Sequence, residues 1–240
     1  MTSLKEVQDP DEALSLFHEY HQMGFKHDYP SYSALVYKLA RSRNFEAVET
    51  VLGYLQDSNV RCGEKLFIAL FQHYGKVQLV DKAVELFNRM MGFNCVRTAQ
   101  SFNALLNVLV DNDRLVDAKE LFDRSAKMGF RLNSVPFNIM IKGWLEKGDW
   151  HQACKRVAAE AYKVLFEMQI GGCEANAATY RMLVDGFCQS GNIGACFVLE
   201  EMVKRKMILD SDGWEALIKD SCRGDGGAGE LVNKLLISTA

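Results

Sequence analysis

Large apolar side chains recur along the chain at a constant interval. Aromatic residues stand 35 residues apart at Tyr32, Phe67, Phe102 and Phe137, and the interval then becomes 43 at Tyr180 and 34 at Trp214. Two further series keep the interval of 35: Leu52, Phe87 and Phe122, and Ala83, Ala118 and Ala153. Because three series share one register, the pattern indicates an internal repeat.

Each repeat reads as two helices, as the stretch from residue 99 illustrates. Its apolar residues fall at i, i+3, i+4 and i+7, which places them on one helical face: Phe102, Leu105, Leu106 and Leu109. Residues 111–114 (DNDR) favour a turn. A second helix starts at Leu115, and we expect it to end near Gly129, since glycine supports a left-handed helix end.

These units predict an all-α fold, a right-handed superhelical solenoid of stacked antiparallel helix pairs similar to tetratricopeptide arrays. A single helix pair cannot bury its apolar face, whereas stacked pairs bury a continuous core. We divide the chain into an N-terminal half repeat or cap, three regular repeats, an elongated repeat, a further repeat, and a partial repeat with a C-terminal cap: residues 1–28, 29–63, 64–98, 99–133, 134–176, 177–210 and 211–240.

The repeat that begins at residue 134 is irregular, with 43 residues instead of 35. The eight extra residues amount to about two helical turns, so one long helix from Trp150 to Met168 can absorb them. The next repeat is one residue short. We therefore expect a kink or an altered superhelical angle within residues 150–200.

Composition narrows the possible functions. Hydrophobic residues make up 48% of the chain, which has only 3 prolines, and this suits a helical protein with a substantial core. The net charge is −3 and the pI is about 6.0, so a nucleic-acid site would have to be a local groove. The 7 cysteines form no Cys-x-x-Cys pair, which favours reduced, buried thiols.

Other chemistry is weakly represented in the sequence. No apolar run approaches the roughly 18 residues of a membrane span, and neither a signal peptide nor a transit peptide is visible. His18 and His21 share a helical face without a third ligand, and the glycines of residues 224–229 lack the Lys-Ser/Thr of a phosphate loop. We expect no enzymatic activity, no cofactor and no metal; the oligomeric state stays open.

Two segments carry a family resemblance. Residues 134–143 (SVPFNIMIKG) and 178–192 (ATYRMLVDGFCQSGN), with Phe-Asn early in two repeats, closely resemble the pentatricopeptide repeat consensus. The resemblance covers roughly residues 11–220 and is to the plain 35-residue class of plant organelle proteins. It implies a mitochondrial location first and a chloroplast location second.

The same resemblance implies single-stranded RNA binding, one base per repeat, in organelle RNA processing, stability or splicing. The fifth and last residues of a motif would read the base, and an asparagine amide offers both a donor and an acceptor. The candidate pairs are Asn103 with Asn133 and Asn138 with Asn176, which resemble a pyrimidine-reading combination with cytosine preferred over uracil. The corresponding pairs in the other repeats match no combination: Ser33 with Gly63, Ile68 with Thr98, and Arg181 with Asp210.

Contacts beyond the base edge follow from the same register. Val135 and Ala178 occupy the second motif position, where the family packs apolar side chains against bases. Arg41 and Lys76 keep a basic residue expected near the RNA phosphates, whereas the equivalent residues of the later repeats are Asp111, Glu146 and Gln189. Because phosphate neutralisation supplies much of the affinity, we expect weak and salt-sensitive binding.

Each of these residues also has a structural interpretation. The asparagines could be solvated, could bond between repeats, or could shape loops, and Val135 and Ala178 could simply pack. The alternative function is a protein-interaction scaffold with little or no RNA binding, which the acidic net charge would suit.

Overall fold

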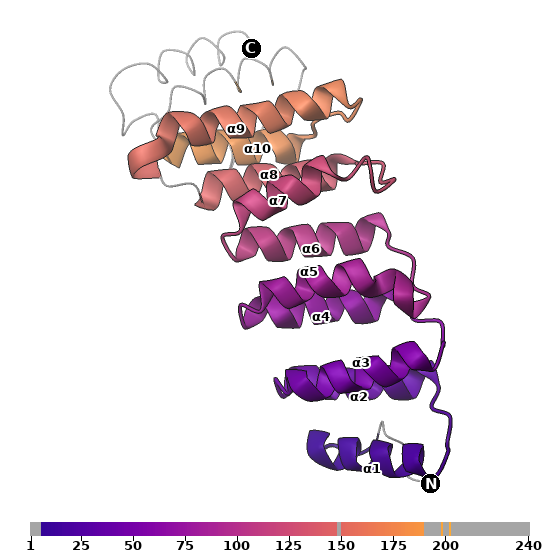
Figure 1. Ribbon diagram of the computed structural model, residues 1–240. Coiled ribbons are helices and arrows are strands. Elements are labelled where there is room, and N and C mark those ends of the chain that lie inside the picture. Colours follow the sequence, from indigo (N-terminus) through magenta and orange to yellow (C-terminus); the bar gives the residue numbers. More distant parts are fainter. Residues whose placement is uncertain (1–5, 148–149, 190–197, 199–201, 203–240) are drawn as a thin grey trace. The chain divides into compact units, whose positions relative to one another are not determined.

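The computed structural model describes residues 6–147 and 150–189, together with positions 198 and 202, and this part of the chain is helical throughout its regular structure (Figure 1). The elements are α1 (Pro10–Gln22), α2 (Tyr29–Arg41), α3 (Phe45–Asp57), α4 (Glu64–Lys76), α5 (Val80–Arg89), the short 3-10 helix η1 (Met90–Phe93), α6 (Ala99–Asp111), α7 (Leu115–Asp123), α8 (Ser134–Lys147), α9 (Trp150–Ile170) and α10 (Ala177–Gln189). The predicted all-α class is confirmed.

The chain divides into two compact units, residues 1–112 and 113–240. In the first unit α2 packs on α3 and α4 packs on α5, while α2, α4 and α6 also contact one another in succession. In the second unit α8 contacts α7, α9 and α10. Within each unit the first helix of a pair therefore packs against the first helix of the next pair, as stacked repeats require.

The recurring apolar residues form the core. The aromatic series that predicted the repeat is buried wherever the structure describes it: Tyr32, Phe67, Phe102, Phe137 and Tyr180 are each at most 4% exposed. Ala83 and Ala118 are fully buried, and a small side chain at that place lets two helices approach closely. Ala153 lies on α9, but its side chain falls outside the described residues.

Left-handed backbone positions recur with the same interval. Gly24, Asn59, Asn94 and Gly129 follow one another at 35 residues, and each has a positive φ, between 50° and 83°. Asparagine tolerates this conformation better than most residues with a side chain. Asn94 also donates its amide to the Asn59 side-chain oxygen at 2.6 Å, which ties two successive helix ends together.

The half repeat at the N-terminus packs through its rings. Phe17 of α1 is buried, stacks on His27 at 4.1 Å between centroids and meets Tyr32 of α2 edge-on at 5.5 Å. His21 lies 4.6 Å from the Tyr54 ring, so its visible role is packing. Among the described residues no group of three His, Cys, Asp or Glu could hold a metal ion.

One helix end differs from the expectation. We expected the helix from Leu115 to end near Gly129, but α7 ends at Asp123. The chain tightens there to i→i−3 hydrogen bonds, from Ser125 N to Phe122 O and from Gly129 N to Ala126 O, both at 3.0 Å. Gly129 does adopt the expected left-handed backbone, with φ 83°.

The elongated second helix is present as α9, a single helix of 21 residues from Trp150 to Ile170. The expected distortion within 150–200 stays a prediction, as does the division into repeats. Most of the later part of the short repeat 177–210, the predicted terminal segment 211–240 and the candidate Asp210 lie outside the described residues. No described helix combines the length and the apolar content that crossing a membrane requires.

Candidate functional site

The fifth-residue candidates occupy equivalent places on the first helices. In the first unit Ser33, Ile68 and Asn103 lie on α2, α4 and α6, and each is half-buried. In the second unit Asn138 on α8 is half-buried and Arg181 on α10 is exposed. Each follows the buried aromatic residue of its repeat. Because successive helical residues are about 100° apart, the fifth residue lies at the edge of the buried stripe.

The two candidate asparagines of this series have different surroundings. The Asn103 side-chain oxygen is inaccessible to solvent, and no described residue donates a hydrogen bond to it. The Asn138 side-chain oxygen accepts the hydroxyl of Thr179 on α10 at 2.7 Å. Asn138 therefore bonds between helices of consecutive pairs, which is one of the structural alternatives that its sequence position left open.

The last-residue asparagines cap helices. Asn133 accepts the backbone N–H of Val135 at 3.1 Å, just before α8. Asn176 accepts the backbone N–H of Thr179 at 3.0 Å, and the Thr179 hydroxyl also lies 3.0 Å from that oxygen. Both asparagines are exposed, and a cap uses the amide oxygen while leaving the two N–H donors of the amide. Asn133 and Asn176 therefore each present amide N–H donors to the solvent.

The repeat at 64–98 offers little to a base. Ile68 has no hydrogen-bonding side chain, and the Thr98 hydroxyl donates to the Glu64 carboxylate at 2.8 Å. Glu64 also accepts the backbone N–H groups of Thr98 at 3.0 Å and of Ser101 at 3.2 Å. Burial alone would raise the pKa of Glu64, but the hydrogen bonds from Ser101 and Thr98 together outweigh it, so the pKa lies below its ordinary value.

The repeat at 29–63 is also internally engaged. The Tyr29 hydroxyl donates to the Gly63 carbonyl at 3.2 Å, and Ser33 is a further hydrogen-bond partner of the same tyrosine. Both base-reading candidates of this repeat therefore contact the same phenol, that of Tyr29.

The two stacking candidates are exposed. Val135 is 44% exposed, and Ala178 is exposed at the first turn of α10, so both are open to a ligand.

The basic candidates gather in the first unit. Arg41 and Lys76 are exposed at the ends of α2 and α4. The pKa of His73 lies below its ordinary value because of burial, with further contributions from the positive charges of Lys76 and Arg41. All three groups are therefore close enough to share one local field. The side chains of Glu146 and Gln189 lie outside the described residues.

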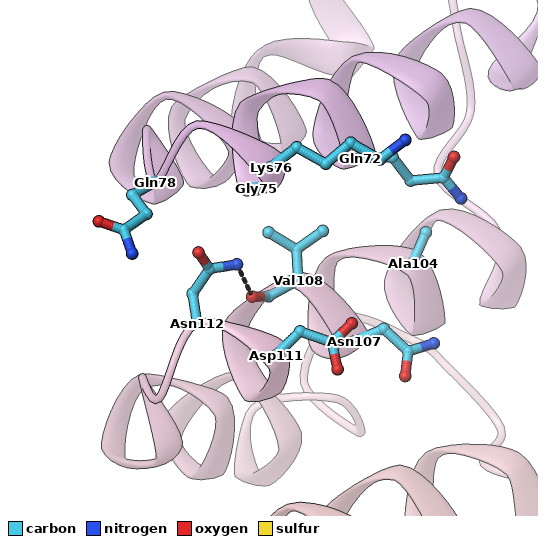
Figure 2. Close-up of a pocket in the computed structure, with 9 residues that line it drawn as sticks. All are labelled: Gln72, Gly75, Lys76, Gln78, Ala104, Asn107, Val108, Asp111 and Asn112. Carbon is cyan, nitrogen blue, oxygen red and sulfur yellow. Dashed lines mark hydrogen bonds between the residues drawn. The ribbon is translucent and has the colours of Figure 1, made fainter.

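A groove of about 570 Å³ opens between α4 and α6, entirely within the first unit (Figure 2). Its floor is Gly75 against Val108, where a Cβ added to the glycine would lie 2.9 Å from Val108 Cγ1. The lining is rich in amides: Gln72, Gly75, Lys76, Gln78, Ala104, Asn107, Val108, Asp111 and Asn112. Sequence reasoning identified Lys76 but not these amides, because polar residues on a helix surface carry no local signal.

Comparisons with known proteins agree with the resemblance. The PPR repeat family profile matches residues 132–189, and the PPR repeat profile matches residues 66–95, 100–130 and 178–207, together more than half of the chain. A mitochondrial pentatricopeptide repeat-containing protein of Arabidopsis thaliana is 58% identical over 135 residues, which are 56% of this chain and 29% of that protein. Another from the same plant is 30% identical over 241 residues, 97% of this chain and 45% of that protein.

Solved structures show the same fold. The crystal structure of the pentatricopeptide repeat protein PPR10 from maize matches with a TM-score of 0.66 at 19% identity, over 98% of this chain and 37% of that one. PPR10 in complex with an 18-nt psaJ RNA element matches with a TM-score of 0.56 at 20% identity, over 92% of this chain and 36% of that one. The chain thus spans less than half the length of these relatives.

Proposed function

Because the chain belongs to the pentatricopeptide repeat family, we propose that it binds single-stranded RNA, one nucleotide per repeat, in the processing, stability or splicing of organelle RNA. The observation that carries this is the equivalent placement of the fifth residues on consecutive first helices within each unit. The complex of PPR10 with RNA supports it, since that protein has the same fold. The proposal involves no catalytic step.

The bases read would be pyrimidines at the repeats 99–133 and 134–176. Asn103 carries a buried oxygen without a partner, and rotation about χ2 exchanges the places of the amide oxygen and nitrogen, which would turn the oxygen toward the surface. There the exocyclic amine of cytosine could donate a hydrogen bond to it. Asn133 and Asn176 would contribute N–H donors to the acceptors that both pyrimidines carry, since their own oxygens cap helices.

Affinity would be modest because few charges meet the phosphates. Arg41 and Lys76 are the basic residues proposed for this role, and the net charge of the chain is −3. The location we propose is the mitochondrion, which the name of the relative with 58% identity supports. The chain spans 29% and 45% of the two Arabidopsis relatives described above. A role in organelle RNA metabolism for a whole protein of that length is therefore part of the proposal.

The test is selection from a randomised single-stranded RNA pool at two salt concentrations. We expect enrichment of sequences with two adjacent pyrimidines at low salt and a weaker enrichment at high salt. Replacing Asn103 with alanine should remove the preference at one of the two positions, while Gln100→Ala on the same helix removes an exposed amide outside the groove and serves as the control for general surface effects on base choice. No enrichment at low salt would contradict RNA binding.

A protein-interaction scaffold is the second candidate. Phe166 and Ile170 lie one turn apart on α9 and are 62% and 72% exposed. Apolar side chains at i and i+4 form a continuous ridge that a partner helix could cover. Failure of RNA enrichment together with specific capture of a protein, lost in the Phe166→Ser variant, would favour this function.

A further inference from the structure

The groove between α4 and α6 has two polar walls of different charge (Figure 2). Gln72 and Lys76 come from α4, and Asn107 and Asp111 come from α6. All four side chains are exposed. They stand at the ninth and thirteenth positions of two consecutive repeats, so each wall presents an amide one turn before a charge.

These groups are not used by the fold in the part of the chain that the structure describes. Neither Lys76 nor Asp111 has an oppositely charged partner within ion-pair distance there. Asn112 differs, since its amide donates to the Val108 carbonyl at 2.8 Å and so belongs to the groove wall. The two charges and the two amides of the walls are therefore available to a ligand.

A nucleotide backbone matches this set of groups. Lysine binds phosphate as a point charge. A carboxylate only accepts hydrogen bonds, so beside a phosphate it is repulsive unless a hydroxyl faces it. The ribose 2′-hydroxyl supplies such a donor, and the amides of Gln72 and Asn107 can serve either group. The volume of about 570 Å³ falls within the roughly 300–1,000 Å³ typical of small-ligand sites.

The repeat at 64–98 is less suited to binding a base edge than to binding a sugar and a phosphate. Ile68 offers a base no hydrogen bond, and the Thr98 hydroxyl already donates to Glu64. The nucleotide that passes this repeat would therefore be held by its sugar and phosphate. Asp111, which departs from the basic residue expected at its position, then has a role of its own.

We propose that the groove between α4 and α6 holds one nucleotide of single-stranded RNA by its phosphate, on Lys76, and by its 2′-hydroxyl, on Asp111, and that it selects RNA over DNA whatever the base. This rests on the proposed RNA binding and adds a sugar-reading repeat to it. A nucleotide without the 2′-hydroxyl leaves Asp111 facing phosphate with nothing to accept, which disfavours DNA.

The test compares one short oligouridine containing two adjacent cytosines, made as RNA and as DNA. Asp111→Ala should weaken RNA binding and leave DNA binding equal or stronger, so that the RNA-to-DNA affinity ratio falls about tenfold, as the loss of a hydrogen bond to a charged group predicts. Glu46→Ala is the matched control, because Glu46 is an exposed carboxylate on α3, away from the groove. It removes the same charge and should leave the ratio unchanged.

A scan of single 2′-deoxy substitutions along the RNA locates the contact. The wild-type chain should lose affinity at one register, and the Asp111→Ala variant should be insensitive there. If wild-type RNA binding depends on Asn103 but the ratio and the scan are unchanged in Asp111→Ala, the groove proposal is wrong and RNA binding stands. If the wild type binds no RNA at low salt, both fail. Circular dichroism of each variant verifies that the helices are intact.

Discussion

Asn103 and Asn138 hold the same place in consecutive repeats but should respond oppositely to alanine. The Asn103 oxygen is buried without a partner, so Asn103→Ala removes a desolvated group and should leave the free energy of unfolding unchanged or raise it by up to about 1 kcal/mol. The Asn138 oxygen accepts from Thr179 at 2.7 Å, so Asn138→Ala should lower it by about 1 kcal/mol.

Urea denaturation followed by circular dichroism measures both changes, and Thr179→Val is the matched control for the second. That variant removes the other partner of the same bond, and because the Thr179 hydroxyl also accepts the backbone N–H of Asn176 at 3.3 Å, it should cost more than Asn138→Ala, with less than additive loss in the double variant. Equal destabilisation by the two asparagine variants would show that their surroundings do not differ in this way.

Glu64 should make stability depend on pH. Its folded pKa lies below the ordinary value of 4.5, because the hydrogen bonds from Ser101 and Thr98 outweigh burial. A depressed folded pKa means that the unfolded chain takes up the proton first as the pH falls. The stabilisation is therefore fully present above 4.5 and is lost as the pH falls through the lower folded value.

The variant Glu64→Gln isolates this contribution. We expect it to lower the free energy of unfolding at pH 7 by about 1 kcal/mol, a value reduced for solvent screening of a half-exposed carboxylate. The difference from the wild type should shrink as the pH is lowered from 5 to 3, measured by urea titration at each pH. A constant difference across that range would assign the effect to packing instead.

At the scale of helices, Gly75 sets how closely α4 and α6 approach. A Cβ there would lie 2.9 Å from Val108 Cγ1 and 3.3 Å from Asn112 Nδ2, so Gly75→Ala should destabilise the chain by about 1–3 kcal/mol through overpacking. Gly53 lies inside α3 with nothing within 4 Å of an added Cβ. Gly53→Ala should therefore stabilise by about 0.5–1 kcal/mol through helix propensity.

Thermal melts of Gly75→Ala and Gly53→Ala test whether close packing of α4 on α6 requires the glycine, because both variants make the same chemical change in a helix. Destabilisation in both would mean that glycine is needed for helix geometry in general. Stabilisation in both would mean that the contact between α4 and α6 at Val108 leaves room for a Cβ on Gly75.

The helices could be predicted from the sequence because the residues that form each buried helical face lie close together along the chain. Phe102 and Leu105 lie within one turn of each other, so burial of one face is visible as spacing along the chain. The early end of α7 was not visible, because residues 124–128 (RSAKM) contain no helix breaker and the end is made by backbone bonds such as Gly129 N to Ala126 O.

The candidate site was predictable to the same extent, in position but not in bonding. Asn138 lies on a first helix, α8, as its place in the repeat predicts, yet its hydrogen-bond partner Thr179 is 41 residues away. Likewise Thr98 and Glu64 are 34 residues apart. Bonds between repeats depend on which residues two neighbouring units bring together, and a single sequence holds no local pattern for that.

At the scale of the molecule, the proposed RNA contacts are unevenly distributed. The chain has a net charge of −3, and both proposed phosphate contacts, Arg41 and Lys76, lie in the first unit, close enough to His73 to lower its pKa. The asparagine pairs proposed to read pyrimidines lie later in the sequence, from residue 103 to residue 176. Base choice and phosphate binding are thus carried by different repeats, and substitutions should be able to separate them.

Salt dependence measures the phosphate part alone. For single strands each neutralised phosphate contributes about 0.7 to the slope of log affinity against log salt, so contacts from Arg41 and Lys76 predict a slope of about −1.4. Arg41→Ala and Lys76→Ala should each reduce its magnitude by about 0.7 without changing the preference for cytosine. Lys127→Ala, which removes an exposed charge in the turn after α7, should leave the slope unchanged. Fluorescence anisotropy with the cytosine-containing oligouridine gives both quantities, and an equal reduction in all three variants would assign binding to diffuse charge rather than to these two residues.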